Sequence, residues 1–341
     1  MNRVIRFLAL SVAPLAILAP AACFAQTSSV RLLKSVNLPG YTGDFDHFAV
    51  DYDRNRLLLA AEDHGTLEVF DLKTSDHLKS VTGFGNPHSI LVRKGAPTVF
   101  ITDSEKQGPT IRDANDYAKK QDVALTPGSD TSKYDASTNT LYIVTGGKDV
   151  DMKTANLEAV NPDTGAKLGS ITFPDNHVEA MAFVDGDPRL FINLTQTNKL
   201  AVVDRHTMKI LETWPVPAAQ QNAMVAFDPA QHRLYVVCRS PGMVVVLNSD
   251  TGALIDKLPA PLRSDEVQYD AAAHKLYVPG GEGFMGIYDT SDPNHLKLLE
   301  KVTTAPGAKT ALLLPNMHRL FLAVSPGDSK AMAKVLTYEV K

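Results

Sequence analysis

The segment Phe227-Asp-Pro-Ala-Gln-His-Arg-Leu-Tyr-Val-Val237 decides the fold, because its pattern returns along the whole chain. An aromatic or aliphatic residue, often followed by aspartate, precedes a turn of about four residues and then a hydrophobic strand. Six further copies, some weaker, begin at Val50, Val92, Tyr134, Phe183, Tyr269 and Leu313. A strand–turn–strand unit that recurs at regular spacing indicates a repeat architecture.

The spacing of these copies predicts the type of repeat. Their second strands are expected to start at residues 57, 99, 141, 190, 234, 276 and 320, in steps of 42, 42, 49, 44, 42 and 44 residues. A four-stranded blade of a β-propeller takes about 40–50 residues. Seven copies therefore predict an all-β fold, a single seven-bladed β-propeller over residues 26–341. Only residues 114–120 suggest a helical period, which makes the second blade look degenerate.

The two ends of the chain complete one blade. The last segment, Lys334-Val-Leu-Thr-Tyr-Glu-Val340, aligns with the third strand of a blade. The early segment Val30-Arg-Leu-Leu-Lys-Ser-Val36 is similar to fourth strands such as residues 297–302. We therefore expect the N-terminal strand to close the last blade, which leaves no open sheet edge in the ring.

The repeat residues resemble those of a known family, the YVTN-type (YncE-like) seven-bladed β-propeller proteins of bacterial envelopes. The resemblance covers roughly residues 30–341. It is carried by Tyr142-Ile-Val-Thr145, Tyr235-Val-Val-Cys238, the Asp-Thr-Gly turns at 163–165 and 250–252, and Phe227-Asp-Pro229. It implies the fold and an envelope location rather than an activity. One relative is thought to bind DNA.

Residues 1–25 are expected to be a signal peptide. Arg3 and Arg6 precede an apolar run from Phe7 to Ala19, and small residues end at Ala25, where we expect cleavage. The run is too short for a good membrane span. An alternative is a lipoprotein signal with Cys23 as the lipidated residue. Either signal predicts a periplasmic or secreted protein.

The composition excludes several classes of protein. The chain has 341 residues, 44% hydrophobic and 21% charged, which is typical of globular proteins. Loss of the signal arginines changes the net charge from −4 to −6, so a nucleic-acid partner is not expected. No other segment approaches membrane-spanning length. Cys238 is then the only cysteine, so no internal disulfide can form, and its hydrophobic strand predicts a buried, inert thiol.

The usual sequence signatures of catalysis are mostly absent. The chain has no Gly-x-Ser-x-Gly elbow, no His-Glu-x-x-His, no Cys-x-x-Cys-His and no P-loop. The segment Gly281-Glu-Gly-Phe-Met-Gly286 matches Gly-x-Gly-x-x-Gly, but a strand rather than a helix is expected after it. We therefore interpret it as a hairpin turn.

Equivalent positions in the repeat predict a ring of polar residues. Eleven positions before each second strand stand Asp46, His88, Asp130, Glu179, Ala223, Asp265 and Lys309. The innermost strand of each blade begins there, so these residues are expected at the mouth of the central channel. Four neighbours in sequence are candidates for the same funnel, namely His47, His177, Asn222 and Glu266.

Two interpretations of this ring remain open. Strand starts are solvated in any propeller, so polar residues belong there without a function. Alternatively the ring is a ligand or cation site, in which Asp46, Glu179 and Asp265 supply oxygen ligands to a divalent cation and His88 supplies an imidazole. Lys309 would then hold an anionic group of a substrate or pair with a carboxylate.

An insertion at residues 146–154 accounts for most of the 49-residue step. It holds Lys148, Asp149, Asp151 and Lys153 and is expected to be a surface loop at the rim of one face. The alternative is a binding loop.

These observations predict a non-enzymatic binding or scaffold protein that holds a small molecule or a periplasmic protein at the channel mouth or a face of the disc. The alternative is a metal-assisted hydrolase or lyase of the lactonase-like propeller kind, which uses the acidic and histidine ring. A third alternative is an accessory to periplasmic redox enzymes. A divalent cation is the one cofactor considered. Closed propellers need no partner for stability, so we expect a monomer.

Overall fold

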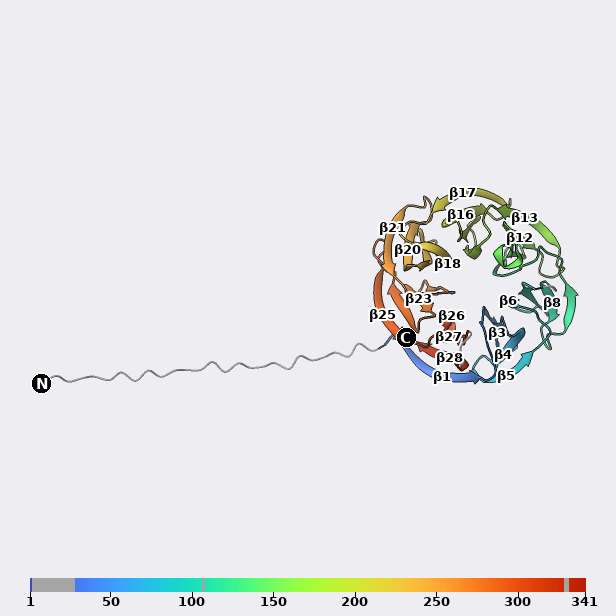
Figure 1. The fold of residues 1–341 in the computed structure, drawn as a ribbon, viewed down its shortest axis with the longest axis horizontal. Coiled ribbons are helices and arrows are strands. Elements are labelled where there is room, and N and C mark those ends of the chain that lie inside the picture. The colour runs from blue at the N-terminus through green and yellow to red at the C-terminus, as the bar shows by residue number, and fades with distance from the viewer. Residues whose placement is uncertain (2–27, 106–107, 328–330) are drawn as a thin grey trace.

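The computed structural model describes Met1 and residues 28–105, 108–327 and 331–341. Figure 1 shows the described strands arranged as a ring of sheets about a central axis. Each of the seven sheets contains four antiparallel strands. The prediction of an all-β, seven-bladed β-propeller is confirmed. Apart from Met1, the predicted signal peptide and the Cys23 alternative lie outside the described residues.

Each blade contains four strands, numbered here from the axis outward. The innermost strands of blades one to seven are β2 (Phe48–Asp51), β6 (Pro87–Val92), β10 (Ser132–Asp135), β14 (Val178–Ala182), β18 (Gln220–Asp228), β22 (Gln268–Asp270) and β26 (Ala308–Leu314). The second strands are β3 (Arg56–Ala61), β7 (Thr98–Asp103), β11 (Thr140–Gly146), β15 (Arg189–Leu194), β19 (Arg233–Ser240), β23 (Lys275–Gly280) and β27 (Arg319–Val324). All seven begin one residue before the predicted start.

The outer strands complete the blades. The third strands are β4 (Thr66–Asp71), β8 (Thr110–Asp113), β12 (Ala155–Val160), β16 (Lys199–Asp204), β20 (Gly242–Asn248), β24 (Phe284–Asp289) and β28 (Ala333–Val340). The fourth strands are β5 (His77–Val81), β9 (Lys119–Asp122), β13 (Lys167–Phe173), β17 (Lys209–Pro215), β21 (Leu254–Pro259), β25 (Lys297–Thr303) and β1 (Val30–Leu38). Two 3₁₀ turns, η1 (Lys148–Val150) and η2 (Pro315–Met317), also occur. Within the described ranges, no helix is long and apolar enough to span a membrane.

The aspartate of the repeat shapes the first hairpin of a blade. Asp228 Oδ1 accepts hydrogen bonds from the backbone N–H groups of Ala230 and Gln231, at 3.0 and 3.2 Å. Such side-chain bonds to the following backbone stabilise turns. In five blades the residue before the second strand then takes a left-handed φ of 50–56°, and these residues are Asn55, Asn139, His232, His274 and His318. Three of the histidines thus lie in hairpin turns, and these turns are at the opposite end of the hairpin from the predicted ring.

The apolar position of the repeat packs between neighbouring blades, as predicted. Phe227 of blade five meets Phe191 of blade four, with ring centroids 5.0 Å apart. Phe183 of blade four meets Tyr142 of blade three at 5.7 Å. Cys238 is fully buried in the cluster between blades four and five, and burial raises the pKa of its thiol to about 12.

The N-terminal strand closes the last blade. Strand β1 pairs with β28 from Val30 opposite Val340 to Leu38 opposite Ala333. Both ends of the chain therefore contribute to blade seven, and Figure 1 shows β1 at the rim beside the C-terminus. This closure pairs the strand edges that would otherwise stay open.

Residues 114–120 are not helical, so that expectation was wrong. Strand β8 ends at Asp113, whose Oδ1 accepts the N–H of Asn115 at 2.7 Å, and Tyr117 has a left-handed φ of 69°. This tight turn leads into β9, and the second blade is complete. The interpretation of the glycine motif is confirmed, because β23 ends at Gly280 and β24 begins at Phe284.

Candidate functional site

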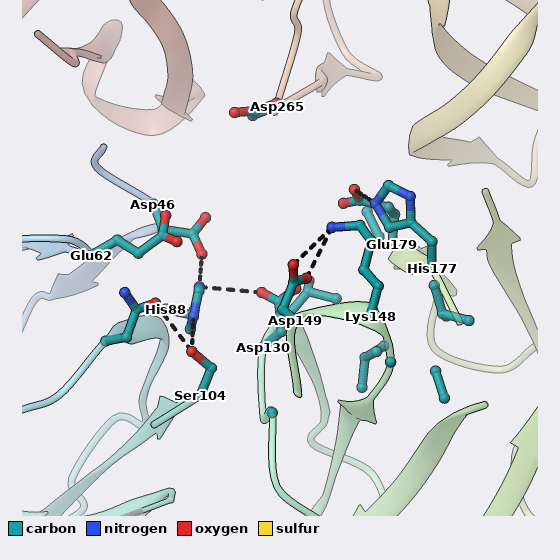
Figure 2. A pocket seen from close by; sticks show the side chains of 18 of the residues that line it. Asp46, Glu62, His88, Ser104, Asp130, Lys148, Asp149, His177, Glu179 and Asp265 are labelled. Carbon is teal, nitrogen blue, oxygen red and sulfur yellow. Dashed lines mark hydrogen bonds and ion pairs between the residues drawn. The ribbon is translucent and has the colours of Figure 1, made fainter. Parts of the chain in front are cut away.

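The predicted ring lies around one cavity of about 520 Å³, here called the channel mouth. Eight of the ten predicted site residues line it, namely Asp46, His47, His88, Asp130, His177, Glu179, Asp265 and Lys309. Figure 2 shows carboxylates and imidazoles from several blades directed into this space. The structure therefore brings most of the predicted residues together, while their role as ligands stays a prediction.

Asn222 and Glu266 do not line the channel mouth. Asn222 is fully buried, and its amide donates to Asn193 Oδ1 at 2.7 Å and to the Lys199 carbonyl at 2.8 Å. A register shift between Asn222 and Met224 interrupts the pairing of β18 here. Glu266 lies deeper, 3.6 Å from His47 Nδ1. The expectation that Asn222 reaches the funnel was wrong, whereas Glu266 lines the channel below the mouth.

A second set of polar residues meets the ring from the ends of the second strands. Glu62, Ser104 and Arg239 stand five positions after the predicted second-strand starts, and all three line the channel mouth. Because paired strands are antiparallel, the end of the second strand lies beside the start of the first. Comparing the residues at this second position of each repeat would have identified all three from the sequence.

On one side of the mouth His88 of blade two connects carboxylates from the two neighbouring blades. Its Nδ1 lies 2.7 Å from Asp46 Oδ2 and 3.4 Å from Asp130 Oδ1. Its Nε2 lies 2.9 Å from Ser104 Oγ. We call Asp46, Glu62, His88 and Asp130 the acidic side of the mouth.

The acidic side has perturbed proton affinities. Burial alone would lower the pKa of His88, but Asp130 and Asp46 outweigh it and raise the pKa to about 10. Burial raises the pKa of Asp130 to about 6, with a further contribution from Asp46. Burial and the charge of Asp46 raise the pKa of Glu62 to about 8. Crowded, desolvated carboxylates take up protons unless a cation joins them.

The opposite side of the mouth is already charge-paired. Arg239 bonds Glu179 Oε1 at 3.0 Å and Asp265 Oδ1 at 2.6 Å. Lys309 contacts Asp265 and also lies 2.9 Å from Asp44 Oδ2. Burial would raise the pKa of Glu179, but Arg239 and His177 lower it to about 2. We call Glu179, Arg239, Asp265 and Lys309 the paired side.

The four predicted metal ligands are therefore divided between the two sides. Glu179 and Asp265 are occupied by Arg239, and Figure 2 shows Asp265 across the cavity from Asp46. Within the described part of the chain, one group offers donor atoms that all lie within 4.8 Å of one another: Asp46, Glu62 and His88. Two predicted ligands thus fall in this group and two do not.

His47 forms the floor of the mouth. Its ring lies 3.5 Å from Asp46 Oδ1 and 3.6 Å from Glu266 Oε2. Burial lowers its pKa, but these two carboxylates raise it to about 10 overall. A second cavity of about 380 Å³ lies beneath it in the channel, and His47 lines both cavities.

The insertion in blade three contributes to the wall of the mouth. Lys148 N–H donates to the Asn176 carbonyl at 2.7 Å, which attaches turn η1 to blade four. Gly147 has a φ of 90°, and a Cβ there would lie 2.8 Å from the same carbonyl. Figure 2 shows Lys148 and Asp149 beside the cavity, and both line it. The insertion is at the rim of the mouth, as predicted.

The mouth carries a surplus of negative charge. Three lysine or arginine side chains line it, Lys148, Arg239 and Lys309, against eight acids: Asp44, Asp46, Glu62, Glu105, Asp130, Asp149, Glu179 and Asp265. With both His47 and His88 protonated and Glu62 neutral, carboxylates still outnumber cations by seven to five. A concave surface lined by an excess of carboxylates attracts cations.

Comparisons with known proteins agree on the fold. No family model matches the sequence, and neither does any curated protein. A chain of the "Crystal Structure of Mitotic Checkpoint Complex" superposes with a TM-score of 0.72 at 13% identity, over 98% of each chain. A chain of Kuenenia stuttgartiensis hydrazine synthase superposes with a TM-score of 0.69 at 14% identity, over 81% of this chain and 91% of that one. At these identities the likeness shows the β-propeller fold alone.

Proposed function

We propose that this chain is an exported binding protein that holds a small, positively charged ligand at the channel mouth. The observation that carries the proposal is the surplus of carboxylates around a cavity of about 520 Å³. A cavity of this size suits a small molecule. The acidic side offers carboxylates that pair with no described lysine or arginine, and the paired side offers fixed polar groups that orient a ligand.

The architecture supports a binding role. Mouth residues stand at the ends of hydrogen-bonded strands. Binding groups on such rigid elements are already in place, so little conformational entropy is lost when a ligand binds. The insertion adds Lys148 and Asp149 at the rim, where a ligand would pass. Export is part of the proposal and rests on residues 1–25, so the periplasm or the exterior is the proposed location.

A broader form of the proposal has a protein as the ligand. One of the similar solved chains is part of a mitotic checkpoint complex, so a chain of this shape can take part in an assembly. A basic segment of a periplasmic partner would satisfy the same carboxylates as a small cation. The proposal commits to the small ligand because the acids surround a cavity rather than a flat face.

The test uses cations and anions of similar size. Residues 26–341 are screened by thermal unfolding with agmatine, putrescine, succinate and glycerol. We expect the two amines to raise the midpoint and succinate to have no effect. The variant Asp130→Asn should reduce the amine effect, whereas Asp163→Asn, at an exposed turn outside the mouth, should not. An equal response to succinate, or an undiminished response in Asp130→Asn, contradicts the proposal.

A second candidate is a metal-assisted hydrolase or lyase. It is favoured by one observation, the group of Asp46, Glu62 and His88 that opens onto the cavity. Catalytic metal sites keep a position open for water or substrate. Hydrolysis of lactone and ester substrates with added Zn²⁺ or Mn²⁺, abolished in Glu62→Gln, would support it. Equal rates in this variant and the parent protein would exclude it.

A further inference from the structure

We propose that Asp46, Glu62 and His88 form a site for one divalent transition-metal cation, with zinc or manganese as the occupant. The inference rests on the proposed cation-binding function and names the occupant of the acidic side. The three residues come from the starts of β2 and β6 and the end of β3, so two adjacent blades build the site. Their donor atoms all lie within 4.8 Å of one another.

The distances suit a shared cation. Asp46 Oδ2 and His88 Nδ1 are 2.7 Å apart. Donor atoms lie about 2.0–2.2 Å from zinc. Small side-chain rotations therefore place all three donors around one ion. Asp130 Oδ1, 3.4 Å from the same imidazole nitrogen, stands close enough to become a fourth ligand or to hold a bound water.

The imidazole is oriented for this role. Ser104 Oγ donates its hydrogen to Asn86 Oδ1 at 3.1 Å, so it accepts from His88 Nε2–H at 2.9 Å. This leaves Nδ1 facing the carboxylates, and His88 is only 8% exposed, so the ring is held in place. Metal-binding histidines are commonly held by such a bond from their other ring nitrogen. Ser104 is thus a positioning residue.

Glu62 is the second observation that points to a cation. Its carboxylate makes no hydrogen bond or ion pair with any residue that the structure describes, although it is half-buried beside Asp46. Both of its carboxyl oxygens are therefore free to bind a cation. Figure 2 shows it next to Asp46 and His88 at the edge of the cavity.

The donor set selects the class of metal. An imidazole with two carboxylates suits zinc or manganese, whereas calcium takes six to eight oxygens. Glu179 and Asp265 cannot join the site, because Arg239 bonds both of them. The paired side stays available for a ligand above the ion.

The test measures binding of Zn²⁺ and Mn²⁺ to metal-free residues 26–341 by calorimetry, with Mn²⁺ also followed by its paramagnetic resonance signal. We expect one ion per chain and Ca²⁺ at least tenfold weaker. Glu62→Gln should weaken binding by about tenfold or more, and Ser104→Ala by a similar factor. Glu62 bonds to no described residue, so Glu62→Gln should keep the parent unfolding midpoint.

The matched control is Asp185→Asn, which removes the same charge from an exposed acid that does not line the cavity. Its affinity should stay within twofold of the parent protein. Equal losses in Glu62→Gln and Asp185→Asn, or no stoichiometric ion, would overturn the site. Agmatine binding by the metal-free chain is measured in parallel. If agmatine binds and the metals do not, the inference fails while the proposed function stands. If the metals bind and agmatine does not, the metal site stands while the organic ligand proposed for the mouth fails.

Discussion

His88 Nδ1 of blade two lies 2.7 Å from Asp46 Oδ2 of blade one, although 42 residues separate them in the chain. The two residues occupy the same position in consecutive repeats. A propeller therefore converts a sequence period into direct contacts around its axis, and the channel mouth gathers side chains from several blades. Variation at that position changes the site while the strands that carry it stay the same.

The paired side should contribute to stability. In Arg239→Gln, the carboxylates of Glu179 and Asp265 lose their shared cation in a partly buried position. We expect the free energy of unfolding to fall by about 1–3 kcal/mol. Urea unfolding followed by the fluorescence of Trp214 measures this change. The control Arg31→Gln breaks an exposed pair with Glu339 and should cost less than about 1 kcal/mol.

Acid should lower the stability of the folded state by protonating Glu179. Arg239 and His177 overcome the effect of burial and lower the pKa of Glu179 from 4.5 to about 2 in the folded state. Its contribution to stability is therefore complete above about pH 4.5 and is lost as the pH falls through 2. Its size is at most about 3 kcal/mol. Unfolding midpoints in urea between pH 6 and pH 2 should fall less steeply for Glu179→Gln than for the parent protein; parallel profiles would refute the assignment.

The strand β1 should be required for a stable ring. Deletion of residues 26–38 removes the outermost strand of blade seven and leaves the edge of β28 unpaired. It also uncovers the apolar cluster that contains Val30. We expect a lower thermal midpoint and self-association on size-exclusion chromatography, because open edges pair with other chains. Deletion of residues 26–27 alone is the control, and a monomeric, equally stable 39–341 fragment would contradict the closure.

Cys238 should be unreactive in the folded protein. Burial raises the pKa of its thiol to about 12, and the thiolate is the reactive form. A disulfide reagent such as dithionitrobenzoate should label residues 26–341 only after unfolding in guanidinium. Rapid labelling of the native protein would show that blades four and five open locally.

The fold was predictable because each copy of the repeat carries its own turn chemistry. Asp135 and Asp228 each accept hydrogen bonds from the turn that follows, and the pattern that they create located every second strand to within one residue. The apparent helical period at residues 114–120 gave a wrong prediction, because its buried tyrosine, Tyr117, lies in a tight turn. Composition cannot distinguish that turn from a short helix.

The site was predictable only where it follows the period. The ring position placed Asp46, His88 and Lys309 at the mouth from sequence alone. Arg239, however, bonds Glu179 from another blade 60 residues away, and that partnership depends on the radius of the ring. Asn222 was misplaced because the register of β18 shifts beside it. Local irregularities of this kind have no sequence signal in a single chain.

The central claim is that the carboxylates of the channel mouth bind cations. Calorimetric titration of metal-free residues 26–341 with agmatine, repeated with Asp130→Asn, tests it most directly. The account predicts one site per chain that is weakened by about fivefold in the variant, and no binding of succinate. Absence of agmatine binding, or equal affinity in the variant, would contradict the claim.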